Sequence, residues 1–266
     1  SCNYYILHNI IFSLPAINIP CKVLYLGFSI LFLHAMQYKH LFFDLDHTLW
    51  DFDANAKLTL HDLYDTLKLE ERGVHDFDLF YRNYLAHNTM LWARYRNGFI
   101  KQAELRVKRM RLSLLDFKIG DEALAEAMSS RFLEMLPTRN VLFPYAIEIL
   151  QYLSNKNYRL HLITNGFEEV QHHKINNSRI SHYFDKVITS EGSNSLKPNK
   201  EIFEFALAAT KANLKESIML GDDLEADIIG ASNAGMDQVF INHVEAVPDF
   251  KPTYMVKSLK ELEDIF

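Results

Sequence analysis

Short apolar runs alternate with longer segments of helical periodicity over most of the chain after residue 38. The runs are rich in Val, Ile, Leu and Phe and end in polar or glycine-containing loops, which is typical of buried strands. This alternation predicts right-handed crossovers and an α/β fold with a parallel sheet covered by helices on both faces. The expected strands are residues 39–43, 159–163, 186–189, 217–220 and 238–241, and the expected helices are 145–155, 168–176, 200–211 and 225–234.

Residues 54–136 interrupt this alternation, because they contain helical periodicity and no convincing strand. Pro137 and Pro144 mark the return of the chain to the sheet. An all-helical insert directly after the first strand predicts a small cap over the edge of the sheet, with residues 36–53 and 137–266 as the core. The expected cap helices lie in residues 58–67, 77–91, 103–115 and 122–136.

Residues 1–35 form an apolar, aromatic leader that differs in composition from the rest of the chain. The apolar run from Val23 to Met36 is shorter than the roughly 20 residues that span a bilayer. Its only preceding basic residue is Lys22, and no Ala-x-Ala cleavage pattern follows. We therefore expect the leader to lie outside the fold, which would begin near Met36. The alternative is a genuine membrane anchor or export segment.

The overall composition excludes several classes of function. The 266 residues are 48% hydrophobic and 23% charged, with a net charge of −6, which is typical of a globular protein and argues against nucleic acid or an anionic membrane as a partner. Cys2 and Cys21 are the only cysteines, so the sequence supports neither a disulfide framework nor a zinc site, and a cytoplasmic location is expected. We interpret the basic run from Arg106 to Arg111, which includes Arg109, as a solvated helix face.

The sequence DLDHT at residues 44–48 directly follows the first expected strand. A carboxylate at Asp44 would be exposed at the sheet edge, where it can attack phosphorus and form an aspartyl-phosphate. Asp46 would lie close enough to protonate the leaving oxygen and then to deprotonate the attacking water. The alternative is that both aspartates only cap a turn or a helix.

Two further loops carry groups that suit an anion. Thr164 and Asn165 follow the second strand, where a hydroxyl and unpaired backbone N–H groups at a strand-to-helix turn can bind phosphate. Lys197, fixed by the following Pro198, can place a positive charge against a phosphoryl oxygen. Each loop taken alone is also compatible with an ordinary Asn-Gly turn or a solvated lysine.

An acidic segment follows the fourth expected strand. Mg²⁺ prefers carboxylate and backbone oxygens, together with substrate phosphate. Asp44, the Asp46 carbonyl and Asp222 would provide such a set, and Asp223 and Asp227 would orient it. The alternative is a helix N-terminus at which acids are favoured by the helix dipole. The coincidence of all these segments at strand ends favours the catalytic interpretation.

The segments DLDHT, ITNG, LKPNKEIF and GDDLEAD resemble the four motifs of the haloacid dehalogenase-like hydrolases. The resemblance covers the chain from about Tyr38 to Phe266 and implies a Rossmann-like core, a helical cap after the first motif, and Mg²⁺-dependent phosphoryl transfer. By this resemblance, Asp44 is the nucleophile, Asp46 the acid/base, Thr164 and Lys197 phosphate ligands, and Asp222 a metal ligand.

The segments LWDFDANA, LWARYRNG and ITNGFEEVQ resemble bacterial pyrimidine 5′-nucleotidases that hydrolyse non-canonical nucleotides. Ser193 to Ser195, before Lys197, depart from the glycine-containing version that is usual in the family. The resemblance implies a small phosphorylated substrate, a pyrimidine nucleoside monophosphate, and no stable membrane or nucleic-acid partner.

The tryptophans Trp50 and Trp92 are the candidates for recognition of a base. A closing cap would sandwich a flat ring between them, and Arg94 or Arg96 would contact base carbonyls or phosphate. The alternative is that both tryptophans pack the cap against the core.

Other functions remain compatible with parts of the sequence. A sugar-phosphate phosphatase or a phosphoglucomutase-like enzyme would share all four motifs. A haloacid dehalogenase would need neither Mg²⁺ nor the second aspartate of the first motif, so Asp46 speaks against it. A non-catalytic binding protein on this fold would not require Asp44, Asp46, Lys197 and Asp222 to be intact.

Overall fold

The computed structural model describes residues 38–245 and 247–266. The expected leader, including Cys2 and Cys21, lies outside these residues. No helix in the described part of the chain combines the length and the apolar character that a membrane crossing requires.

The described residues form a six-stranded parallel sheet in the order β3-β2-β1-β4-β5-β6. The parallel sheet predicted from the alternating pattern is confirmed. The sixth strand was not expected, because three residues are too short to show a period. The strands are β1 (His40–Phe43), β2 (Arg159–Thr164), β3 (Phe184–Thr189), β4 (Ser217–Gly221), β5 (Asp237–Ile241) and β6 (Tyr254–Val256).

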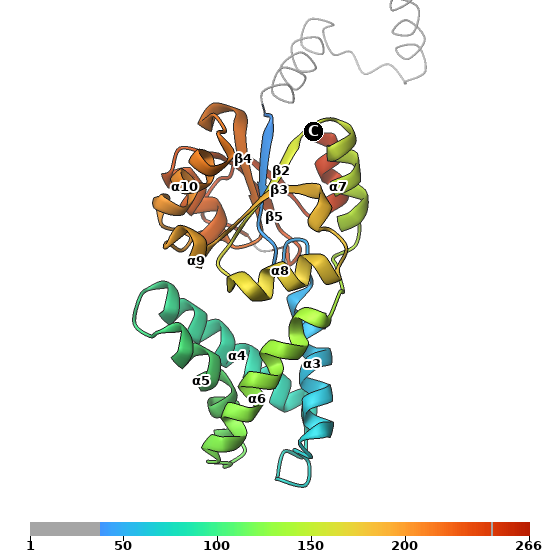
Figure 1. The fold of residues 1–266 in the computed structure, drawn as a ribbon, viewed down its shortest axis with the longest axis vertical. Coiled ribbons are helices and arrows are strands. Elements are labelled where there is room, and N and C mark those ends of the chain that lie inside the picture. The colour runs from blue at the N-terminus through green and yellow to red at the C-terminus, as the bar shows by residue number, and fades with distance from the viewer. Residues whose placement is uncertain (1–37, 246) are drawn as a thin grey trace, which may run out of the picture. The chain divides into compact units, whose positions relative to one another are not determined.

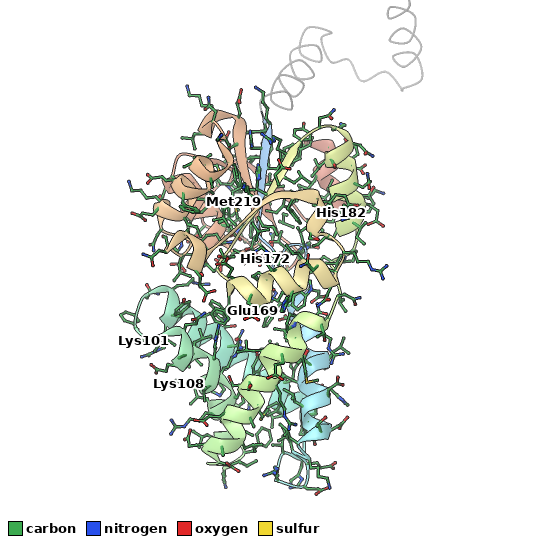
Figure 2. The ribbon with its side chains drawn as sticks, in the orientation of Figure 1. Lys101, Lys108, Glu169, His172, His182 and Met219 are labelled. Atoms are coloured by element: carbon green, nitrogen blue, oxygen red, sulfur yellow. The ribbon has the colours of Figure 1, made fainter. Side chains whose placement is uncertain are left out.

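Both faces of the sheet are buried. Successive strand residues point to opposite sides of the sheet, and residues of both orientations are packed in hydrophobic clusters. Leu41 and Phe43 of β1 belong to the larger hydrophobic cluster, whereas Phe42 between them belongs to a second cluster. Met219 lies in the middle of the sheet and is part of the second cluster (Figure 2). Helix α7 (Ala146–Asn155) and the 3₁₀ helix η6 (Leu259–Asp264) contribute to the first cluster.

The remaining core helices follow the strands as the pattern predicts, with one difference. The expected single helix at 225–234 is a π-helix, η5 (Leu224–Ile229), continued by α11 (Gly230–Asn233). The amides of Asp227 and Ile228 both donate to the Asp223 carbonyl, which widens this turn. The other helices are α8 (Glu168–Asn177), α9 (Ser190–Ser193) and α10 (Lys200–Thr210), with short 3₁₀ helices η2 (Leu136–Thr138), η3 (Ser181–Tyr183) and η4 (Leu214–Glu216).

Four helices follow β1 and lie beyond the carboxyl ends of the strands (Figure 1). Asp51, Asp76 and Asp121 begin three of them, because each side chain accepts the backbone N–H of the residue three positions later. Apolar side chains on their facing sides pack together and belong to the same large hydrophobic cluster as residues of the sheet. We refer to these four helices as the cap. They are α3 (Phe52–Thr66), α4 (Phe77–Arg96), α5 (Gln102–Leu115) and α6 (Glu122–Met135).

The basic run on α5 does not form one solvated face. Lys101 immediately precedes α5 and Lys108 lies on it (Figure 2), where Lys108 pairs with Glu104 of the same helix. Arg109 is only 2% exposed. Its interpretation from the sequence is therefore wrong, because helix α5 turns this position toward the interior of the cap.

Candidate active site

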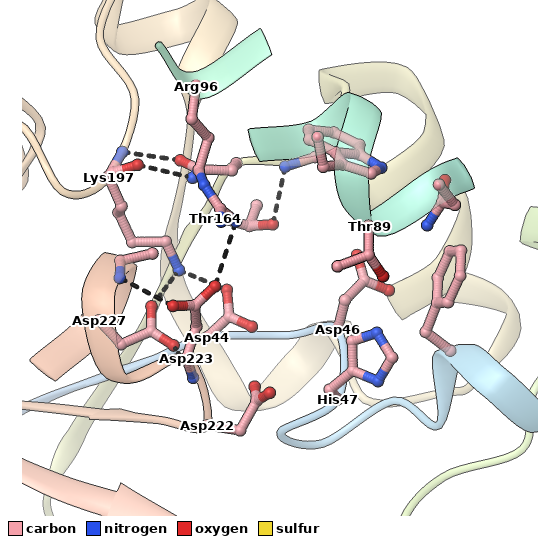
Figure 3. Close-up of a pocket in the computed structure, with 16 residues that line it drawn as sticks. Asp44, Asp46, His47, Thr89, Arg96, Thr164, Lys197, Asp222, Asp223 and Asp227 are labelled. Atoms are coloured by element: carbon pink, nitrogen blue, oxygen red, sulfur yellow. Dashed lines mark hydrogen bonds and ion pairs between the residues drawn. The ribbon is translucent and has the colours of Figure 1, made fainter. Parts of the chain in front are cut away.

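A cavity of about 250 Å³ lies at the carboxyl ends of β1, β2 and β4 and is closed on its other side by residues of α3 and α4 (Figure 3). Ligand pockets commonly measure about 300–1,000 Å³, so this volume suits a small substrate. The lining residues are Asp44, Asp46, His47, Phe52, Asn88, Thr89, Trp92, Arg96, Thr164, Asn165, Gly166, Lys197, Asp222, Asp223, Ala226 and Asp227.

The structure thus gathers segments that are more than 170 residues apart in the sequence, as the Thr48–Asp222 hydrogen bond illustrates. Parallel strands end at one edge of the sheet, which is why the four motifs meet there. Two expected cap residues, Trp92 and Arg96, also line the cavity, whereas Trp50 and Arg94 do not. The core residues brought together are Asp44, Asp46, Thr164, Asn165, Lys197, Asp222, Asp223 and Asp227.

Lys197 lies at the centre of the charged groups. Its Nζ donates to Asp44 Oδ1 at 2.5 Å, to Asp227 Oδ1 at 2.6 Å and to the Ile163 carbonyl at 2.8 Å. An ammonium group has three protons, and all three have protein acceptors here. Lys197 therefore holds Asp44 in one orientation and also brings positive charge next to it.

Burial is the main cause of the raised pKa values of the three carboxyl groups in this cluster. It raises the pKa of Asp44 to about 6, although the Lys197 ammonium acts in the opposite direction. Burial and the Asp227 carboxylate raise the pKa of Asp222 to about 7, and burial raises that of Asp227 to about 7 as well. Burial would lower the pKa of Lys197, but the carboxylates of Asp227 and Asp44 outweigh it and raise this pKa. The cluster holds more negative charge than one lysine neutralises.

Carboxylate oxygens of Asp44, Asp222 and Asp227 lie within 4.8 Å of one another. Thr48 Oγ1 donates to Asp222 Oδ1 at 2.8 Å and so orients it. Hard oxygen donors in this number suit Mg²⁺. The cluster also contains the carboxylate of Asp227, which the sequence predicted only to orient the ligands. The contribution expected from Asp46 is its backbone carbonyl.

Asp227 approaches the end of β4 very closely. A Cβ atom at Gly221 would lie 2.2 Å from Asp227 Oδ2, so only glycine fits at this position. Asp227 Oδ2 also accepts the Asp223 amide at 3.1 Å. Asp223 in turn begins η5 by accepting the amides of Glu225 and Ala226. Asp223 and Asp227 therefore fix the loop that carries Asp222.

The Asp46 carboxylate is held by two residues of α8. Lys174 Nζ lies 2.6 and 2.9 Å from its two oxygens, and Gln171 Nε2 donates to Oδ2 at 2.9 Å. Lys174 and Gln171 are 2% and 0% exposed. Neither residue was predicted from the sequence as part of the site. Their spacing of three residues, which places both on one face of the helix that follows the second motif, is the signal that would have indicated them.

The loop after β2 leaves one donor free for an anion. Thr164 Oγ1 accepts from Gln171 Nε2 at 2.6 Å and from the Gly166 amide at 3.1 Å, so its own proton is available. The Asn165 side chain is already used, because it bonds both the amide and the carbonyl of Lys197. Any contact of Asn165 with phosphate would therefore come from its backbone.

The cap side of the cavity differs from the expected tryptophan sandwich. Trp50 is fully buried, and the Lys174 ammonium lies 4.3 Å from its ring centroid. It therefore has no exposed face in this structure on which a base could stack. Phe52 lines the cavity on the same side, and Arg94 is exposed outside it.

Trp92 and Arg96 connect the cap with the core. The Trp92 ring stacks on Phe167, directly after the turn from Thr164 to Gly166, at a centroid distance of 5.6 Å. Arg96 Nη1 donates to Asp223 Oδ2 at 3.1 Å. Asn88 and Thr89, one helical turn before Trp92, also line the cavity and were not predicted. Thr89 points toward the side of the cavity that contains Asp46 and His47 (Figure 3).

Comparison with known proteins agrees with this geometry. The family described as haloacid dehalogenase-like hydrolase matches residues 38–235. Pyrimidine 5′-nucleotidase PynA of Streptococcus pneumoniae is 34% identical over 232 residues, which cover 86% of this chain and 95% of PynA. Pyrimidine 5′-nucleotidase YjjG of Escherichia coli is 31% identical over 235 residues, covering 86% and 98%.

Solved structures show the same architecture. The HAD-hydrolase YfnB from Bacillus subtilis, solved with bound magnesium, superposes with a TM-score of 0.77 at 25% identity and covers 86% of this chain and 98% of YfnB. L-2-haloacid dehalogenase from Xanthobacter autotrophicus shares the fold with a TM-score of 0.66 at 16% identity, over 85% of this chain and 96% of the dehalogenase. The chain belongs to the haloacid dehalogenase-like hydrolases.

Proposed function

We propose that this chain is a Mg²⁺-dependent phosphomonoesterase that transfers a phosphoryl group first to Asp44 and then to water. The observation that carries the proposal is the Asp44 carboxylate at the end of β1, bonded to buried Lys197. A second acid, Asp46, lines the same cavity. A phosphomonoester needs a proton for its leaving oxygen, whereas a departing halide does not, so Asp46 favours a phosphatase over a dehalogenase.

In the first step, an Asp44 oxygen attacks phosphorus while the bond to the ester oxygen breaks. Asp46 gives its proton to that oxygen, and the substrate leaves as an alcohol. The free proton of Thr164 can hydrogen-bond a phosphoryl oxygen, because Thr164 Oγ1 already accepts two other bonds. Lys197 supplies positive charge beside the attacking carboxylate throughout.

In the second step, water loses a proton to the Asp46 carboxylate and attacks phosphorus. The bond between Asp44 and phosphorus breaks, which releases inorganic phosphate and restores the Asp44 carboxylate. Asp46 is again protonated, so both acids return to their starting state.

Asp44, Asp222 and the Asp46 backbone carbonyl would hold Mg²⁺, with Asp223 and Asp227 orienting them. When bound, the ion offsets the negative charge of these carboxylates and of the phosphoryl group. The raised pKa values of Asp44 and Asp222 support this assignment, because burial and, to a smaller extent, the neighbouring carboxylates disfavour their ionised forms, and a bound cation would offset both.

Pyrimidine nucleoside 5′-monophosphates are the proposed substrates. Support comes from the two relatives named pyrimidine 5′-nucleotidases, which match most of the chain. The cavity is small, and the aromatic side chains of Phe52 and Trp92 line it near the polar groups. The predicted cap, residues 54–136, contributes Asn88, Thr89, Trp92 and Arg96 to this side of the cavity.

A hydrolysis screen with and without Mg²⁺ tests the proposal. UMP, CMP, ribose 5-phosphate, glucose 6-phosphate and a 2-haloacid would be compared at equal concentrations. We expect phosphate release from UMP and CMP with the highest kcat/KM, loss of activity in EDTA, and recovery when Mg²⁺ is added. Full activity in EDTA, or halide release from the haloacid, would contradict it.

A further inference from the structure

Arg109 is an unusual residue because it is a buried cation of the cap without an acidic partner. It is 2% exposed, and among the described residues it forms no ion pair. The guanidinium carbon lies 4.9 Å from the centroid of the Phe132 ring and 6.0 Å from that of Tyr84. Burying an uncompensated charge is costly. Packing alone therefore does not explain why a charged side chain lies at this buried position.

The side-chain hydrogen bond of Arg109 points toward the cavity. Its Nη1 donates to Asn88 Oδ1 at 3.0 Å, and Asn88 is 8% exposed and lines the cavity. A guanidinium group has donors and no acceptor, so the amide atom that faces it must be the oxygen. The other end of the Asn88 amide, Nδ2, is consequently turned away from Arg109. It has no acceptor among the described residues.

We propose that Asn88, oriented by Arg109, determines substrate specificity by donating a hydrogen bond from Nδ2 to the ring carbonyl of a pyrimidine base. The inference rests on the proposed nucleotidase function and adds to it the side chain that recognises the base. Arg109 is a positioning residue, because it contacts Asn88 and does not line the cavity.

The chemistry of the base fits this donor. Uracil, cytosine and thymine all carry a carbonyl at C2, so one amide N–H₂ group can serve all three. The nearby guanidinium charge polarises the amide and makes its N–H groups better donors. The phosphate would lie at the opposite side of the same cavity, near Asp44, while Asn88 comes from the cap helix α4.

The test is the ratio of kcat/KM for UMP to kcat/KM for ribose 5-phosphate, which carries the same phosphate and sugar but no base. In Asn88→Asp, the new carboxylate keeps an acceptor for Arg109 but removes the donor. We expect kcat/KM for UMP to fall roughly 10- to 100-fold, while the value for ribose 5-phosphate stays within about threefold. Met90→Ala, on the exposed side of the same helix, is the matched control and should leave both values unchanged.

Arg109 provides a second measurement. Arg109→Met frees the Asn88 amide to rotate, so the UMP to ribose 5-phosphate ratio should fall. Arg109→Lys retains a donor for Asn88, so its UMP to ribose 5-phosphate ratio should be close to that of the wild type and higher than that of Arg109→Met. Asn88→Leu leaves the guanidinium unpaired, so it should lower the Tm as well as the ratio.

The outcomes separate the inference from the proposed function. If the wild type prefers UMP and the Asn88→Asp variant keeps that preference, the role of Asn88 is excluded while the nucleotidase function stands. Equal losses on both substrates would mean that Asn88 and Arg109 only stabilise the cap. If the wild type itself shows no preference for UMP, the proposed substrate class and the inference both fail.

Discussion

The two sides of the cavity are built differently. On the core side, the charged side chains are bonded to other protein groups, as Lys197 is to Asp44 and Asp227, and the free donor is the Thr164 hydroxyl. On the cap side, Asn88 keeps a free donor and the aromatic side chain of Trp92 lines the cavity. A network that is already closed fixes reacting groups before substrate arrives, whereas free donors gain partners only from a substrate. This difference supports the proposal that the core performs the chemistry and the cap selects the substrate.

The largest effect is expected from the nucleophile on the core side. Asp44→Asn keeps an acceptor for Lys197 but cannot form the phosphoryl intermediate, so kcat should fall at least about a thousandfold on every substrate. The Tm should not fall, because burial raises the pKa of Asp44 and its charge therefore costs stability at neutral pH. Steady-state kinetics and thermal unfolding measure the two quantities. Activity within tenfold of the wild type would remove Asp44 from the mechanism.

A smaller, selective effect is expected at the residue that holds Asp46. Lys174→Met removes the ammonium group 2.6 Å from the Asp46 carboxylate. Proton donation matters for a sugar alcohol and little for a good leaving group such as 4-nitrophenolate. We therefore expect kcat on UMP to fall roughly 10- to 100-fold, and kcat on 4-nitrophenyl phosphate to fall several times less.

His172→Ala, at an exposed position on the same helix, is the control for Lys174→Met and should change neither rate. Equal losses on the two substrates would show that Lys174 supports the fold and does not position the acid.

On the cap side, Trp92→Ala should change substrate preference more than chemistry. The stacking contact with Phe167 and the aromatic lining are both lost. We expect kcat/KM for UMP to fall about tenfold, since one stacking contact contributes about 1–3 kcal/mol. The value for 4-nitrophenyl phosphate should fall by less. Phe99→Ala, at an exposed cap position, is the control. Parallel losses would leave Trp92 a packing residue.

The smallest expected effect is a dependence of the thermal stability on pH. The pKa values of Asp222 and Asp227 are raised to about 7, so the folded state binds more protons than the unfolded state between about pH 4 and 7. Their contribution to stability is therefore lost as pH rises through this window. In EDTA, the Tm should be a few degrees lower at pH 8 than at pH 6. Each kcal/mol of lost stability lowers the Tm by roughly 2–4 °C in a protein of this size.

Asp222→Asn should reduce this pH dependence, and Mg²⁺ should reduce it in the wild type by offsetting the charge. A pH dependence that is identical in the wild type and in Asp222→Asn would show that these carboxylates do not repel one another as the structure indicates.

The sequence by itself determined the parallel sheet and the meeting of Asp44, Thr164, Lys197 and Asp222. The reason is general: strands that alternate with helices run parallel, so the loops after them share one edge. Family membership followed from the same motifs.

Only the tertiary structure decided where individual helix side chains point. Lys174 of α8 reaches Asp46 and Arg109 of α5 turns into the cap, because the packing of each helix selects which of its faces meets a neighbouring element. Trp50, which precedes α3, is buried. A sequence period gives the apolar face of a helix but not its rotation against a neighbouring element. The orientation of Asn88 depends further on one contact with Arg109, 21 residues away in the chain.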